Sequence, residues 1–214
     1  LSFGKMRKVE NNLDYKKKIK ILDNAKKFVR KNGWSKNLFN SLINKDVSNS
    51  DLIYLYPNGY KDLLSFALNQ VNLTLENKLI KTNIINFPIS KRIKNILMTR
   101  MQILNDDIIF YKKTFNHLLL PQNSKIMKKN LYTTIDNIWY LAGDNSTDFS
   151  FYTKRITLAT IYVNALFVLY NKNLQETEEN IDKNLKIISK IPKLKDRFSF
   201  LKDNLPVLLK GFLN

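Results

Sequence analysis

The sequence predicts an all-α protein, and three observations support this fold class. Apolar residues recur at intervals of three and four along most of the chain, and no segment shows the strict alternation of a β-strand. Only 5 Gly and 5 Pro occur among 214 residues, and 44% of the residues are hydrophobic. This composition favours a folded chain with a buried core over a disordered one.

The first third of the chain predicts a long helix, two short helices and a second long helix. The first covers residues 15–31, where apolar positions share one face and lysines fill most of the remainder, and Gly33 ends it. The short helices fall in KNLFNSLI and SDLIYLYP, and the next long helix covers residues 60–76. Paired short helices are typical of a helix-turn-helix. These stretches resemble the amino-terminal part of TetR-family regulators.

The remainder predicts four further helices, at residues 89–103, 108–120, 125–141 and 149–170. Pro88 stands at the entry of the first, and Pro121 and Gly143 close the second and third. The fourth has only a narrow polar stripe, so we expect it to be buried on most sides. We divide the chain into a helix-turn-helix-like part (1–76), a helical ligand-binding part (77–192) and an amphipathic helix (193–214), forming one continuous unit.

The residue inventory argues against an enzyme. The chain has no Cys and one His, His117, so a disulfide framework, a thiolate nucleophile and a His-rich zinc site are excluded. We interpret His117 as a partly buried residue near the end of a helix. We expect no catalytic residue, no metal site and no cofactor.

The net charge of +18, from 36 Lys and Arg against 18 Asp and Glu, favours an acidic partner such as nucleic acid or an anionic membrane. A coding bias that enriches Asn, Ile and Lys accounts for part of this charge. The helix in the position that would read DNA, SNSDLIYLYP, offers Asp51, Leu52, Ile53 and Leu55 and no cation. Because base and phosphate contacts need polar or cationic side chains, sequence-specific nucleic acid binding is not expected.

The carboxyl end, KLKDRFSFLKDNLPVLLKGFLN, places an apolar stripe beside cations. We predict that it contacts an anionic membrane surface. The alternative is a last helix packed on the core, and Pro206 interrupts the helix in either case. The predicted membrane-binding residues are Phe198, Leu201, Lys202, Leu205, Leu208, Lys210 and Phe212.

The stretch WYLAGDNSTDFSFYTKR, residues 139–155, joins two predicted helices. Gly143 fits a left-handed helix end, and Asp144 and Asp148 fit turn and capping positions. Capping does not require the aromatic and cationic residues beside them, which are side chains that concentrate binding energy at interfaces. Two aspartates without a Glu-x-x-His pair make a poor di-iron site.

The same stretch carries a family resemblance. Ile138-Trp139, Ala142-Gly143-Asp144, Ser146-Thr147-Asp148-Phe149, Tyr152-Thr153-Lys154-Arg155, Leu158-Ala159 and Ile161-Tyr162 resemble the hallmark block of the ubiquinone-biosynthesis accessory proteins, the Coq-nine family. Gly33-Trp34, Leu55-Tyr56-Pro57-Asn58-Gly59 and Leu118-Leu119-Leu120-Pro121 fit the same family in order.

The resemblance implies a TetR-like helical bundle that binds an isoprenoid or other lipid and forms a homodimer. It also implies a partner, the di-iron demethoxyubiquinone hydroxylase, and a terminal amphipathic helix that contacts the membrane. The docking residues implied at the block are Trp139, Asp144, Asp148, Phe151, Tyr152 and Arg155. Phe151 stands where many relatives carry Trp, Ser150 stands where Asn is usual, and Phe151 also fits a core position.

We therefore predict a membrane-associated lipid-binding accessory protein of ubiquinone biosynthesis that presents isoprenoid quinone intermediates to this hydroxylase. The alternative is a TetR-like DNA-binding transcriptional regulator. The family implies the matrix side of the mitochondrial inner membrane, or the bacterial cytoplasm at the membrane, and the sequence does not choose between them. Neither the bound lipid nor the residues that contact it are assigned.

Overall fold

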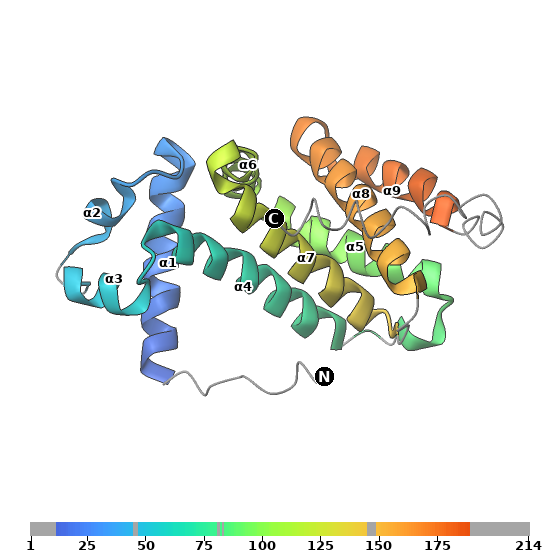
Figure 1. The fold of residues 1–214 in the computed structure, drawn as a ribbon, viewed down its shortest axis with the longest axis horizontal. Coiled ribbons are helices and arrows are strands. Elements are labelled where there is room, and N and C mark those ends of the chain that lie inside the picture. The colour runs from blue at the N-terminus through green and yellow to red at the C-terminus, as the bar shows by residue number, and fades with distance from the viewer. Residues whose placement is uncertain (1–11, 45–46, 81, 83, 145–148, 189–214) are drawn as a thin grey trace.

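The computed structural model describes residues 12–44, 47–80, 82, 84–144 and 149–188 (Figure 1). Within these ranges the chain is helical, and its only pairing of extended backbone is an isolated bridge between Asn44 and Val47. The predicted all-α class is confirmed. The TetR-like arrangement of the helices stays a prediction, and the seven predicted membrane-binding residues lie outside the described residues.

The described helices follow the predicted order closely. Their bounds are α1 Asn12–Asn32, α2 Leu38–Leu42, α3 Asn49–Leu55, α4 Tyr60–Ile80, the short 3₁₀ helix η1 Ile84–Asn86, α5 Ile89–Asn105, α6 Ile108–Leu118, the 3₁₀ helix η2 Pro121–Asn123, α7 Ser124–Leu141, α8 Phe149–Asn171 and α9 Leu174–Ile188.

Local sequence signals set the ends of the amino-terminal helices. Gly33 follows α1 with a φ of 76°, a left-handed conformation that glycine adopts without steric cost. At α3, the Ser48 hydroxyl accepts a hydrogen bond from the Asp51 amide (3.1 Å), and the Asp51 carboxylate accepts one from the Ser48 amide (3.0 Å). This reciprocal capping box stabilises a helix of only 7 residues.

The helices are arranged along one long axis, with α1, α2 and α3 at one end and α8 and α9 packed side by side at the other (Figure 1). Helix α4 extends from the amino-terminal end and packs on α5 and α7, while α5 also packs on α9. One continuous cluster of buried apolar side chains extends from α1 to α9. The division of the chain into three parts that form one continuous unit stays a prediction.

Helix α9 was not predicted from the sequence. Asn173 caps its first turn, because the Asn173 side chain accepts from the Glu176 amide and donates to the Glu176 carboxylate, both at 2.9 Å. Ile181 and Leu185 on one face are buried. The Asn-x-x-Glu spacing was the available sequence signal for this helix start.

A charged residue lies in the middle of the core. Arg100 on α5 is 1% exposed, and its guanidinium donates to Asn72 Oδ1 on α4 (2.7 Å), Thr134 Oγ1 on α7 (3.2 Å) and the Tyr162 hydroxyl on α8 (3.0 Å). All three acceptors are neutral. Arg100 therefore connects four helices through hydrogen bonds, in an interior where unpaired polar groups are costly.

Helix α8 is buried on most of its circumference, as predicted. Leu158, Ala165 and Leu169 are at most 2% exposed. The exposed stripe contains two apolar residues, Ile156 (53%) and Phe167 (43%), beside the expected polar ones. Ile156 lies four residues before Thr160 and shares its exposed face.

Candidate functional site: the corner between helices α7 and α8

The site singled out by sequence begins with the carboxyl end of α7. The Asp144 amide donates to the Trp139 carbonyl and the Gly143 amide donates to the Tyr140 carbonyl, both at 3.0 Å, which is the pattern of a Schellman motif. Gly143 has a φ of 80°, as its predicted role requires. Arg92 on α5 donates to the Ala142 carbonyl (3.0 Å) and to the Phe87 carbonyl (2.6 Å), so the helix end is also fixed from outside.

An ion-pair network joins the end of α7 to the start of α8. Asp144 Oδ1 lies 2.7 Å from Lys154 Nζ, and Asp144 Oδ2 lies 3.6 Å from Arg155 Nη1. Arg155 also donates to Asp136 Oδ1 from Nη2 (2.6 Å) and Nε (3.0 Å). The side chains of Asp144 and Arg155 are only 6% and 13% exposed. Because low exposure reduces screening by water, this network restrains the corner more than a surface pair would.

The aromatic residues of the corner divide into inner and outer groups. Trp139 is 2% exposed and lies in the core, with Lys154 Nζ 5.6 Å from its ring. Phe151 is half-buried beneath the Arg155 guanidinium, whose central carbon lies 3.3 Å from the ring centroid. Tyr152 packs edge-on against Phe151 at 5.2 Å and is 48% exposed. Of these three rings, Tyr152 is the one available to a partner.

The six predicted docking residues therefore occupy different positions. Trp139, Asp144 and Arg155 face inward and hold the corner, Phe151 supports Tyr152, and Tyr152 reaches the surface. Asp148 lies outside the described residues. Their role in docking stays a prediction. Two exposed residues of this corner were missed by sequence, Tyr140 (78%) at the end of α7 and Ile156 (53%) one turn after Tyr152.

Helix α3 presents a surface unlike that of a DNA-reading helix. Ile53 (61%) and Tyr54 (72%) are its exposed large side chains. Asp51 pairs with Lys17 of α1 at 2.6 Å, and hydrogen bonds from Lys17 and Ser48 lower the pKa of Asp51 to about 2. Helix α3 thus keeps a negative charge at neutral pH and carries no cation. Helix α3 therefore offers no cationic side chain for contacts to DNA phosphates.

The described surface includes a pocket at each of two places that concern ligand binding. One, of about 400 Å³, lies between the end of α4, η1 and α5, and is lined by Leu79, Thr82, Ile84, Phe87, Asn95, Met98, Thr99 and Gln102. The other, of about 440 Å³, lies where the turn before α2 meets the turn before α4. Across the described residues, no three His, Asp or Glu side chains come together as metal ligands do, and no helix is long and apolar enough to cross a bilayer.

His117 behaves largely as predicted. It lies in the last turn of α6, half-buried against Trp34 and Tyr60, whose ring centroids are 6.5 and 5.6 Å away. Burial, and then the nearby Lys61 charge, lower the pKa of His117, so the imidazole is neutral at neutral pH. Its Nε2 atom is buried without a hydrogen-bond partner in the described structure.

Comparison with known proteins locates the family signal at the corner. A COQ9 family model matches residues 125–192, which contain α7 except for its first residue, the corner, α8 and α9. The probable ubiquinone biosynthesis protein coq9, mitochondrial, of Dictyostelium discoideum is 27% identical over 177 residues. That alignment covers 75% of this chain and 55% of the relative.

Two further relatives agree. The ubiquinone biosynthesis protein COQ9, mitochondrial, of Bos taurus is 26% identical over 167 residues, covering 75% of this chain and 52% of the relative. The Schizosaccharomyces pombe protein of the same description is 28% identical over 151 residues, covering 68% and 58%. The chain spans about half the length of these relatives. The resemblance found in the sequence is thereby confirmed, because the chain is similar to COQ9 proteins over about three quarters of its length.

Proposed function

We propose that the protein is a lipid-binding accessory protein of ubiquinone biosynthesis, peripheral on a membrane, that presents isoprenoid quinone intermediates to the demethoxyubiquinone hydroxylase. The names of the relatives support the pathway. They also support a mitochondrial location, which we assign to the matrix side of the inner membrane. The homodimer is proposed on the family resemblance alone.

The α7–α8 corner carries the docking part of this proposal. Its ion pairs fix the ends of two long helices, and these helices expose Tyr140, Tyr152 and Ile156. Exposed aromatic side chains on a rigid support lose little conformational entropy on binding and are enriched among residues that dominate binding energy. The corner lies inside the part of the chain that matches the family model. These features are those of a protein-docking surface.

The pocket between α4, η1 and α5 supports the lipid part of the proposal. Its walls combine apolar side chains with a few amide and hydroxyl groups, as small-molecule sites generally do. Ile80 (81%), Ile85 (70%) and Ile89 (45%) are exposed on the same three elements. Exposed apolar side chains on the elements that form an open pocket suit the entry of an isoprenoid chain from a membrane.

Replacement of Tyr152 by Lys is expected to weaken hydroxylase binding about tenfold or more. The change removes an aromatic contact and places a cation where an apolar contact forms. The expected loss of binding free energy is that of an interface residue with a large effect on affinity. Binding is measured by titration of the purified hydroxylase, and circular dichroism confirms that helicity is retained. Phe151 is avoided because its ring supports Arg155.

Tyr132→Lys is the matched control. Tyr132 lies on α7 two turns before Tyr140 and is 56% exposed, so the same substitution changes charge and aromatic content equally. This control is expected to bind the hydroxylase normally. Equal binding by the Tyr152 and Tyr132 variants would remove the corner from the docking surface.

A further inference from the structure

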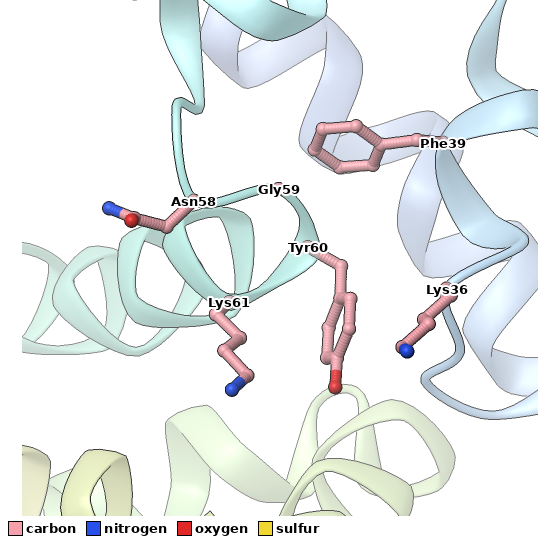
Figure 2. A pocket seen from close by; sticks show the side chains of 6 residues that line it. All are labelled: Lys36, Phe39, Asn58, Gly59, Tyr60 and Lys61. Atoms are coloured by element: carbon pink, nitrogen blue, oxygen red, sulfur yellow. The ribbon is translucent and has the colours of Figure 1, made fainter.

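The pocket at the amino-terminal end of the molecule is lined by cationic and aromatic side chains that have no role in the proposed function. Six residues line its volume of about 440 Å³: Lys36, Phe39, Asn58, Gly59, Tyr60 and Lys61. Lys36 comes from the turn before α2, Phe39 from α2, and the others from the turn before α4 and its first residues. Two lysines, a phenol and an aromatic ring thus converge from segments separated by about twenty residues of chain (Figure 2).

The polar ends of three side chains gather on one side of this pocket. Figure 2 shows the Tyr60 ring between the side chains of Lys36 and Lys61, with both ammonium groups and the hydroxyl group directed the same way. Phe39 forms the opposite wall. The arrangement provides two positive charges and one hydroxyl donor beside an aromatic surface.

Tyr60 is held in this position by its packing. Its ring lies 5.6 Å from the His117 imidazole, edge-on, and 6.5 Å from the Trp34 ring. Trp34 is itself fixed, because its indole nitrogen donates to Thr114 Oγ1 at 2.9 Å. The hydroxyl group is therefore presented by a ring with little freedom to rotate away.

The two lysines are not neutralised by the protein. Within the described residues, neither ammonium group forms an ion pair, and no acidic side chain lines the pocket. The nearest carboxylate in sequence, Asp62, accepts hydrogen bonds from the Asn58 amide (2.8 Å) and the Asn58 side chain (3.1 Å). The positive charge of the pocket is left for an external anion.

We propose that this pocket binds a phosphate group carried by a small organic molecule. A phosphate monoester has a charge of about −1.5 to −2 at neutral pH, which matches two ammonium groups better than a single carboxylate does. Its remaining oxygens accept a hydrogen bond from the Tyr60 hydroxyl, and its organic part packs on Phe39. Both lysines are exposed to water, so the affinity is modest and falls with ionic strength.

Phenyl phosphate is the soluble probe for this site, measured by calorimetric titration of the full chain. The double variant Lys36→Gln and Lys61→Gln is expected to bind it about tenfold more weakly, and Tyr60→Phe about threefold more weakly. Tyr60→Phe keeps the ring and its packing, so it measures the contribution of the hydroxyl group to binding without disturbing the fold. Benzyl alcohol, which lacks the phosphate, is expected not to bind.

The control variant is Lys16→Gln with Lys183→Gln, which removes two exposed positive charges from α1 and α9. It is expected to bind phenyl phosphate as the unmodified chain does. Equal affinity of the pocket variant and this control, or no binding by the unmodified chain, would overturn the proposal. The hydroxylase-docking corner is left intact by these substitutions, so either result leaves the proposed function standing.

Vesicle sedimentation distinguishes the two possible sources of the phosphate, a lipid headgroup and a free phosphorylated molecule. Phosphatidylcholine vesicles with and without phosphatidic acid are sedimented with the unmodified chain, the pocket variant and the control. If only the pocket variant loses the sedimentation that depends on phosphatidic acid, the site binds a lipid headgroup. Unchanged sedimentation, together with lost phenyl phosphate binding, assigns it to a free phosphorylated molecule.

Discussion

Replacement of Arg100 by Ala is expected to lower the free energy of unfolding by about 3–5 kcal/mol. The substitution leaves a cavity in the core and removes the donor shared by Asn72, Thr134 and Tyr162, all at most 7% exposed. Each buried oxygen that loses its partner costs about 1–3 kcal/mol. The partial relaxation of Asn72 toward another donor offsets part of this sum.

Urea unfolding followed by circular dichroism measures this change. Lys183→Ala, an exposed substitution on α9, is the control and is expected to stay within about 0.5 kcal/mol of the unmodified chain. Arg100→Lys keeps the charge but cannot reach three helices at once, and is expected to be destabilising as well. A loss of less than about 1 kcal/mol for Arg100→Ala would show that the buried guanidinium does not hold the four helices together.

Replacement of Trp139 by Ala is expected to cost a comparable amount, about 3–5 kcal/mol, because a large aromatic side chain is removed from the core. Trp139 is 2% exposed, and its carbonyl is an acceptor in the Schellman motif that ends α7. Its indole Nε1 has no hydrogen-bond partner in the described structure, so the ring contributes through packing. Trp139→Phe, which retains an aromatic ring, is expected to cost clearly less.

The two Trp139 variants are compared in the same unfolding experiment, and hydrogen exchange of the α7–α8 corner shows whether the loss is local. Faster exchange at Ala142 and Gly143 in the Ala variant is expected, because the cavity adjoins that helix end. Similar costs for Ala and Phe would contradict the packing role and indicate that the indole nitrogen has a partner.

The helix ends were predictable because single residues fix them. Gly33 and Gly143 adopt positive φ values that other residues avoid, and Pro121 follows α6 closely. Helix α9 was missed although Asn173 and Glu176 form a recognisable cap. Ile181 and Leu185 recur four residues apart on its buried face, so the spacing of apolar residues also indicated this helix.

The Arg100 network could not be predicted from the sequence. Nothing in the stretch TRMQILN distinguishes Arg100 from an arginine on the protein surface. The acceptors of its hydrogen bonds lie on three other helices. The same limit applies to the pocket around Tyr60, whose lysines come from the turn before α2 and from the start of α4. Contacts between distant segments depend on how helices pack, which periodicity does not specify.

At the corner between α7 and α8, the sequence identified the segment but not which of its side chains are exposed. The block WYLAGDNSTDFSFYTKR identified the corner, its glycine and the family. It did not separate Trp139 and Asp144, which face inward, from Tyr140 and Tyr152, which are exposed. Neighbouring residues on a helix point about 100° apart, so Tyr140 is exposed beside a buried Trp139.

The central claim is that the protein carries an isoprenoid quinone intermediate. The most direct test is organic extraction of the purified full chain, followed by mass spectrometry of the retained lipid, with an unrelated basic helical protein purified in parallel. Selective recovery of quinone intermediates or other isoprenoids over the control is the predicted result. Recovery of no lipid above the control from cells that synthesise ubiquinone would contradict the claim.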